Sequence, residues 1–172
     1  VTYTVLAPVT ITPADKEDTY SGTAIAIPVE GMFTIPDTAG DETYTVANGT
    51  GKGTFAENKL TVTECGTFNV TVTTAATETH ATGKATATLT VKRADVTIDH
   101  ADKAATYSTE GINIPVDDMF IIPTTAGKAT YSLTNLTGEG SFADDKLTVT
   151  KCGTFTVTVS TAETATHNAG KD

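Results

Sequence analysis

The sequence lacks the residue types on which several kinds of binding site depend. Its 172 residues include no Trp and no Gln, only two Cys and three His, and aromatic residues make up 6% of the chain. Sugar and peptide sites generally present exposed aromatic faces, so this composition disfavours a ligand site built on stacking. An internal thioester needs a Gln beside a Cys, and the absence of Gln excludes that group.

The charge balance and the hydrophobic pattern disfavour two further classes of partner. The chain has 21 acidic against 11 basic residues, a net charge of −10. A phosphate backbone is repelled by such a chain, so we expect no nucleic-acid partner. No apolar run reaches about 18 residues, so we expect no membrane insertion. No basic segment leads into an apolar stretch, so we expect no signal peptide within these residues.

Threonine is the residue that the sequence has in abundance. It occurs 40 times, nearly one residue in four, in a chain that is 38% apolar. A β-branched side chain suits a strand, and its hydroxyl group can face water. In residues 67–73 the apolar Phe68, Val70 and Val72 alternate with polar residues, the pattern of a half-buried antiparallel strand. We therefore expect a folded, all-β protein.

The chain consists of two similar tandem copies of one unit. Shifting the sequence by 87 residues places residues 9–84 on residues 96–171 without a gap, and 47 of these 76 positions are identical. A period of this length is too long for a solenoid repeat and fits an independent small domain. The sequence predicts two tandem domains, 1–93 and 94–172, with residues 1–8 as a candidate end of a preceding repeat.

Each copy contains about eight short alternating segments separated by turn residues, which is typical of a β-sandwich. In the first copy the expected strands are 9–12, 25–28, 32–35, 44–46, 53–56, 60–63, 67–73 and 86–91. We expect residues 64–66 to form a hairpin turn with Gly66 at a positive φ. The join at residues 92–95 is short and contains no Gly or Pro. It predicts a stiff, elongated arrangement of the two domains.

The last strand of the second copy poses a boundary question. The second copy ends before the counterpart of residues 85–91, while residues 1–5 resemble residues 87–91 if one linker residue is dropped. In one alternative each unit begins with this strand and both units are whole. In the other, which we favour, the strand closes each unit and the second copy lacks it. Residues 1–5 would then be able to complete the open edge of a neighbouring molecule.

The chain resembles a known family over almost its whole length. The stretch TYTVANGTGKGTFAENKLTVTECGTFNVTVTT, its second copy and the following ATATLTVKRADVTI look like bacterial immunoglobulin-like repeats, found in tandem on secreted and cell-surface proteins. The PADKEDTYSG stretch also resembles the opening segment of a related group of bacterial surface repeats. The resemblance implies extracellular β-sandwiches that serve as a stalk, a spacer or occasionally an adhesive tip. Such repeats usually have a small residue, often Ala, before the turn Gly, where this chain has Cys65 and Cys152.

The two cysteines are expected to be free thiols. Cys65 and Cys152 are equivalent residues, so they repeat with the same translation as the domains. A disulfide needs Cα atoms within about 7 Å, which an extended tandem does not allow within one molecule. Bonding between molecules is the alternative.

The histidines offer only weak candidate sites. His80 and His167 are equivalent and are expected to be ordinary loop residues. His100 lies among Asp95, Asp99 and Asp102, an acidic group at which Ca²⁺ would find oxygen ligands. The carboxylates lack the dense alternating spacing of a dedicated calcium loop, so we favour solvated surface charge.

Two further features of the sequence are candidate sites. A covalent Lys–Asn link would draw on Lys16, Lys59 and Asn69, with Lys103 and Lys146 in the second copy, but the counterpart of Asn69 is Thr156. In 119–122 both faces of a strand are apolar, so Met119 and Ile121 would form a contact patch if they faced outward. We expect a loop to cover them.

No catalytic arrangement of residues occurs in the sequence, and no catalytic, cofactor-binding or metal-binding residue is predicted. The sequence and the resemblance together favour two tandem immunoglobulin-like β-sandwich domains acting as a structural spacer of a bacterial cell-surface or secreted protein. Its expected partners are other domains of the same protein. The alternative is an adhesion or carbohydrate-binding module that recognises a host protein, a glycan or a cell-wall ligand.

Overall fold

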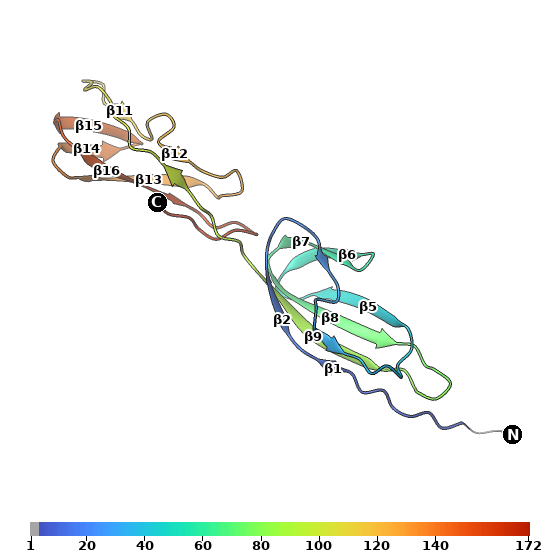
Figure 1. Ribbon diagram of the computed structural model, residues 1–172. Helices are drawn as coiled ribbons and strands as arrows, with labels where there is room; N and C mark the ends of the chain where they lie inside the picture. Colours follow the sequence, from blue (N-terminus) through green and yellow to red (C-terminus); the bar gives the residue numbers. More distant parts are fainter. Residues whose placement is uncertain (1–3) are drawn as a thin grey trace. The chain divides into compact units, whose positions relative to one another are not determined.

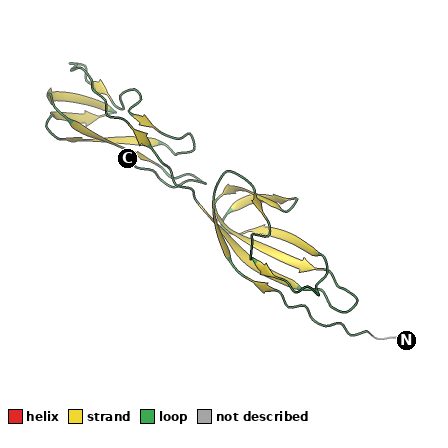
Figure 2. Ribbon diagram, in the orientation of Figure 1, coloured by secondary structure: helices red, strands yellow, loops and turns green. Residues whose placement is uncertain are grey.

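The computed structural model describes residues 4–172 and shows an all-β protein, with no helix in that range (Figure 2). The chain divides into two compact units, Val1–Ala94 and Asp95–Asp172. The division lies one residue from the sequence boundary drawn after Arg93. Across residues 4–172, a helix long and apolar enough to cross a membrane is not found.

The first unit contains nine strands (Figure 1). They are β1 (Thr12–Pro13), β2 (Lys16–Thr19), β3 (Ile25–Ala26), β4 (Phe33–Thr34), β5 (Glu42–Asn48), β6 (Lys52–Ala56), β7 (Lys59–Glu64), β8 (Gly66–Thr74) and β9 (Lys84–Lys92). One sheet has the order β2-β9-β8-β5, a second has the order β3-β7-β6, and β1 pairs with β4. Strand β9 is antiparallel to β8 and parallel to β2, so it lies inside its sheet.

The core of the first unit draws its side chains from both large sheets. Leu60 of β7, Phe68 of β8 and Leu89 of β9 are fully buried and belong to one apolar cluster. The alternation seen in the sequence places these residues on the inner face of each strand, since side chains point to opposite faces at successive positions. The result is a sandwich-like arrangement of two sheets.

The expected hairpin at residues 64–66 is wrong. Strands β7 and β8 belong to different sheets, so Cys65 lies in a link that crosses from one sheet to the other. Gly66 does have a positive φ of 149°, and a Cβ there would lie 2.4 Å from the backbone nitrogen of Gly51. The hairpin lies instead between β6 and β7, where Glu57 and Asn58 have positive φ values of 51° and 56°.

The second unit repeats seven of these strands at the 87-residue offset. They are β10 (Asp99–His100), β11 (Ile112–Asn113), β12 (Phe120–Ile121), β13 (Ala129–Asn135), β14 (Glu139–Ala143), β15 (Lys146–Lys151) and β16 (Phe155–Thr161). The pairings are β10-β12, β11-β15-β14 and β13-β16. No strand in the described residues of this unit corresponds to β2 or β9.

The sequence leaves open whether the strand at residues 85–91 closes the first unit or begins the second, and this strand is β9. In the structure this strand pairs with β8 and β2, both of the first unit. Of residues 1–5, the structure describes only Thr4 and Val5, which form no strand, and residues 1–3 lie outside the described residues.

Two threonines of the described residues are buried, so their hydroxyl groups do not face water. Thr74 at the end of β8 and its counterpart Thr161 are buried. The Thr74 Oγ1 accepts a hydrogen bond from the buried N–H of Gly83 at 2.9 Å, and the Thr161 Oγ1 accepts the same bond from Gly170 at 2.9 Å. Each hydroxyl therefore satisfies a backbone donor that water does not reach.

Replacing Thr74 by Val is expected to destabilise the first unit by about 1–3 kcal/mol, because the isosteric side chain leaves the buried Gly83 N–H without this acceptor. Hydrogen exchange along a urea series, followed on peptides of the first unit, measures the change. Thr61→Val on β7 is the matched control, since Thr61 is exposed. Equal stability of the two variants would contradict a structural role for the Thr74 hydroxyl group.

Candidate functional site

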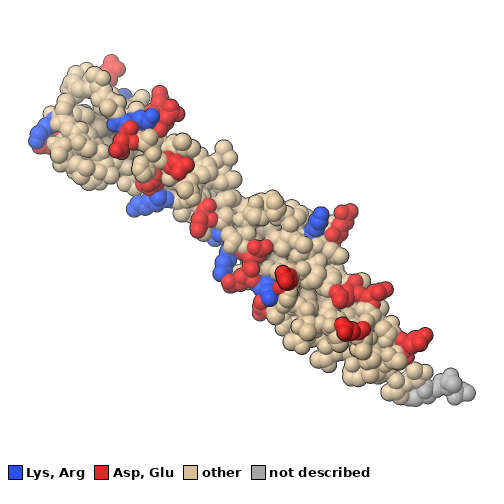
Figure 3. Space-filling model, viewed as in Figure 1, with Lys and Arg blue, Asp and Glu red and all other residues tan. Residues whose placement is uncertain are grey.

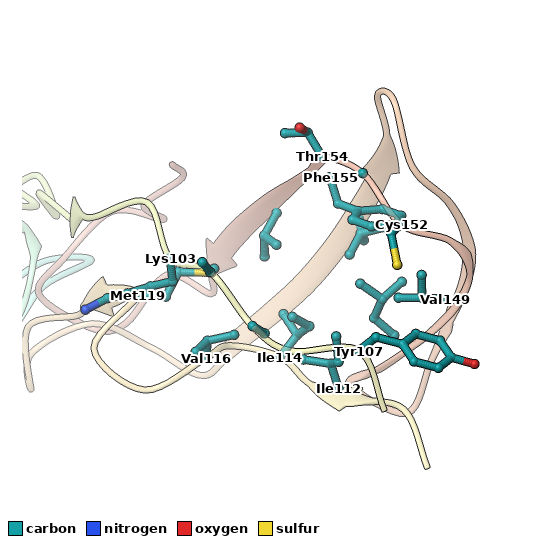
Figure 4. Close-up of a pocket in the computed structure, with 16 residues that line it drawn as sticks. Lys103, Tyr107, Ile112, Ile114, Val116, Met119, Val149, Cys152, Thr154 and Phe155 are labelled. Atoms are coloured by element: carbon teal, nitrogen blue, oxygen red, sulfur yellow. The ribbon is translucent and has the colours of Figure 1, made fainter. Parts of the chain in front are cut away.

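The second unit contains an apolar groove of about 300 Å³, which we call the open groove (Figure 4). It lies between β15, β16 and the segment 103–107. Its lining includes Lys103, Tyr107, Ile114, Met119, Cys152 and Phe155. Figure 4 shows the Cys152 sulfur pointing toward Val149 within this space.

The open groove exists because core positions of the second unit are uncovered. Phe68 is 0% exposed in the first unit, whereas its counterpart Phe155 is only partly buried. In the first unit β9 covers this position and contributes the buried Ala87, Leu89 and Val91. The counterpart of β9 would span residues 171–179, of which the sequence contains 171 and 172.

A second opening, of about 570 Å³, runs along β16. Residues 154–158 form one side of it, and His100, Asp102 and Asp172 are also in its lining. Strand β2 pairs only with β9 in the first unit, so the corresponding segment 103–106 has no strand to pair with in the second. Both openings thus border the position that β9 holds in the first unit.

Cys65 and Cys152 form no disulfide within the described residues, and their surroundings differ. Cys65 is half-buried, and its Sγ donates a hydrogen bond to the Lys92 carbonyl oxygen at 3.6 Å. Burial raises the pKa of the Cys65 thiol, an effect that the positive charge of Arg93 partly offsets. Cys152 is exposed at the edge of the open groove.

The two loop histidines are held by the same local bonds. The His80 N–H donates to the Thr77 Oγ1 at 3.0 Å, and the His80 Nδ1 lies 2.9 Å from the Thr79 Oγ1. The corresponding distances at His167 are also 3.0 and 2.9 Å, to Thr164 and Thr166. These contacts make each histidine part of its own turn.

The acidic residues near His100 do not assemble into a cluster. The His100 Nδ1 lies 2.6 Å from the Asp172 Oδ2, while the Asp95 Oδ1 accepts a hydrogen bond from the Asn168 Nδ2 at 2.8 Å. Among residues 4–172, no three His, Cys, Asp or Glu side chains come together as metal ligands would. The arrangement therefore offers no chelating group for Ca²⁺.

The structure also places two other sequence candidates. Asn69 is exposed on β8, so it lacks the buried setting that a covalent Lys–Asn link requires. Ile121 is 67% exposed, so the expectation of a covering loop is wrong for this residue. Met119 differs from Ile121, since it is partly buried and faces the open groove.

Charged side chains of both signs are spread over the visible face of the protein, and acidic ones are more numerous (Figure 3). One ion pair recurs with its signs exchanged. In the first unit the Lys52 Nζ lies 2.6 Å from the Glu64 Oε2. At the equivalent positions of the second unit the Glu139 Oε1 lies 3.2 Å from the Lys151 Nζ. The two copies thus differ in sequence here while both keep a cross-strand ion pair.

Exchanging the charges in the first unit is expected to preserve the pair. Lys52→Glu alone sets two carboxylates opposite each other across β6 and β7, which lowers the stability of the first unit. Adding Glu64→Lys recreates the order of the second unit and should recover most of that loss. A double-mutant cycle on the midpoint of urea unfolding measures the coupling.

Salt provides the control for this cycle. The Debye length falls from about 30 Å at 0.01 M salt to about 3 Å at 1 M, so the coupling between the exposed side chains should shrink. A coupling of zero at low salt would contradict an electrostatic origin for the conserved pairing.

The chain matches no protein-family model, and the comparison with curated proteins finds no relative for it.

Proposed function

We propose that the chain is a non-catalytic spacer made of two immunoglobulin-like domains of a secreted or cell-surface bacterial protein. Two features support the immunoglobulin-like assignment in the first unit. Its sheets contain the strand orders β9-β8-β5 and β3-β7-β6, which correspond to the orders G-F-C and B-E-D of an immunoglobulin sandwich. Its core lies between these sheets, as in that fold.

The repetition is the observation that carries the spacer proposal. Seven strands recur at one fixed offset, and structural details such as the buried Thr74 and Thr161 bonds recur with them. Duplication that reproduces a scaffold adds length to a protein, which is what a spacer needs.

Small-angle scattering of the full chain tests the requirement that a spacer be extended. The expected maximum dimension is that of two sandwiches placed in line. A maximum dimension near that of two sandwiches packed side by side would contradict the proposal.

Binding arrays test the proposal against the adhesion alternative. The full chain is applied to glycans and to host and matrix proteins, and no saturable binding is expected. Saturable binding that survives physiological salt would replace the spacer function by adhesion, since weak attraction between charges would be screened at that salt concentration.

A further inference from the structure

Strand β13 of the second unit has one edge with which no strand pairs. Within the described residues its only strand partner is β16. The same edge is unpaired in the first unit, where β5 ends the sheet β2-β9-β8-β5 although β9 is in place. The free edge of β13 is therefore a feature of the fold, and it lies on the side of β13 that faces away from β16.

Other long edge strands of the protein have features that keep a sheet edge from pairing with another chain. Strand β2 is charged at Lys16, Glu17 and Asp18. Strands β6 and β14 each begin with a charged residue, Lys52 or Glu139, and each has a shift in its ladder directly after that residue. Charged side chains and bulges both oppose edge-to-edge association. These three edges are therefore poor acceptors for a further strand.

Strand β13 lacks these features. Its sequence is ATYSLTN, with no charged residue, no proline and no shift in its register with β16. Its counterpart β5 has Glu42 in the position of Ala129. The Tyr44 hydroxyl group donates a hydrogen bond to the Glu42 carboxylate, so a charge is held on that strand. At β13, by contrast, an approaching copy of the strand meets no like charge.

The backbone groups at the free edge belong to every second residue of β13. The Ala162 N–H donates to the Lys128 carbonyl oxygen at 3.0 Å, just before the strand. The Leu136 N–H donates to the Thr154 carbonyl oxygen at 3.1 Å, just after it. Hydrogen-bonded and non-hydrogen-bonded positions alternate in an antiparallel ladder, so even-numbered residues direct their N–H and C=O groups to β16. The residues whose groups face the free edge are Ala129, Tyr131, Leu133 and Asn135.

A second copy of β13 is complementary to this edge. A two-fold axis through Ser132 sets all seven residues of β13 opposite the same seven residues of the other copy, in antiparallel order. Tyr131 then lies opposite Leu133 of the second copy, and both side chains are half-buried. Thr130 lies opposite Thr134 on the other face. The residues whose backbone groups face the edge are also set opposite one another, so each of them can donate and accept a main-chain bond.

We propose that β13 is a self-association site through which two copies of the chain join edge to edge. The occupant of the edge is β13 of a second copy, paired antiparallel about Ser132. The result is one sheet of the order β16-β13-β13-β16 that runs through both molecules. Such an interface uses the same surface on both partners, so it closes with two copies. This site goes beyond the spacer function, because it holds two chains together, and it stands if that function fails.

The mass of the protein in solution tests this association. Sedimentation equilibrium is measured on the full chain from about 10 µM to about 1 mM, because a single strand pair is a small interface. A reductant is present so that the exposed Cys152 does not link two molecules. The average mass should rise from that of one chain toward that of two. The association should be stronger at about 1 M than at about 0.01 M salt, because salt screens the repulsion between two chains of net charge −10.

Ser132 provides a test of the register, because its side chain is exposed and lies at the proposed axis. Ser132→Lys sets two positive charges directly opposite each other, and Ser132→Glu sets two negative ones. Each variant alone should dimerise at least about tenfold more weakly than the unmodified chain. An equimolar mixture of the two variants should recover the dimer, since it sets opposite charges across the axis. Thr45→Lys is the matched control, because Thr45 is the exposed counterpart of Ser132 on β5, and it should leave the association unchanged.

Hydrogen exchange of single amides, followed by NMR, identifies the edge without any variant. The amides of Tyr131 and Leu133 face the free edge, so they should exchange more slowly as the protein concentration rises. The amide of Ser132 faces β16 and should change much less.

The proposal is overturned if the unmodified chain keeps the mass of one molecule at the highest concentration, or if the Tyr131 and Leu133 amides exchange at a rate independent of concentration. Undiminished dimerisation of Ser132→Lys, or a mixture that fails to recover the dimer, would contradict the register. Weaker association of Thr45→Lys would place the contact on β5, and masses beyond two copies would show an open-ended contact; each result would also overturn the proposal.

Discussion

Replacing Phe68 by Ala is expected to cost the first unit about 3–5 kcal/mol of unfolding free energy, because the ring is fully buried and its loss leaves a cavity. The equivalent change, Phe155→Ala, should cost the second unit clearly less. Phe155 is only partly buried and already borders the open groove, so its removal widens a hollow instead of creating one. Urea unfolding followed by hydrogen exchange on peptides of each unit measures both losses in one molecule.

The two phenylalanines serve as controls for each other. Both occupy the same position of the repeat, and both are flanked by Thr67 or Thr154 on one side. The two variants therefore have the same substitution and differ in how deeply the phenylalanine ring is buried. Losses of equal size would mean that Phe155 is as well packed as Phe68, which contradicts the open groove.

The sequence is informative about strands because local alternation determines which face of a strand is apolar. Residues 67–73 illustrate this: the alternating pattern places Phe68 and Val70 inside, and both are buried in the structure. Local alternation does not predict which strands pair with each other. The partner of Tyr44 is Val72, 28 positions away, and nothing near either residue specifies that contact.

The link at Cys65 shows the same limit. The expected positive φ of Gly66 is confirmed. Whether the next strand pairs with the previous one or enters the opposite sheet depends on distant segments, here on β5 and β9. Local turn signals do not contain that information, and the hairpin prediction failed for this reason.

The candidate site was partly visible in the sequence. Comparing the two copies shows that the given residues reach only the first two positions of the counterpart of β9, and the structure shows a groove beside that position. The buried roles of Thr74 and Thr161 could not be predicted, because nothing in the sequence near them separates these two from the other threonines of the chain. Only the contacts to Gly83 and Gly170 distinguish these two from the rest.

Cys65 and Cys152 differ in whether a strand lies against the thiol. In the first unit the end of β9 lies against Cys65, whose Sγ donates to the Lys92 carbonyl oxygen. Burial raises the pKa of Cys65, so at pH 8 a smaller fraction of it is thiolate, the reactive form. Cys152 occupies the same position of the repeat but is exposed.

Alkylation of the unmodified chain at pH 8 is therefore expected to be at least about tenfold faster at Cys152 than at Cys65, because Cys152 is exposed, whereas burial shields Cys65 and lowers its thiolate fraction. Mass spectrometry of the two cysteine peptides at successive times gives both rates from one sample. In 6 M guanidinium chloride the rates should converge, because neither burial nor β9 then distinguishes the sites. Leu89→Ala loosens the fully buried centre of β9 and should speed Cys65 while leaving Cys152 unchanged. Equal rates in the native chain would show that β9 does not shield Cys65.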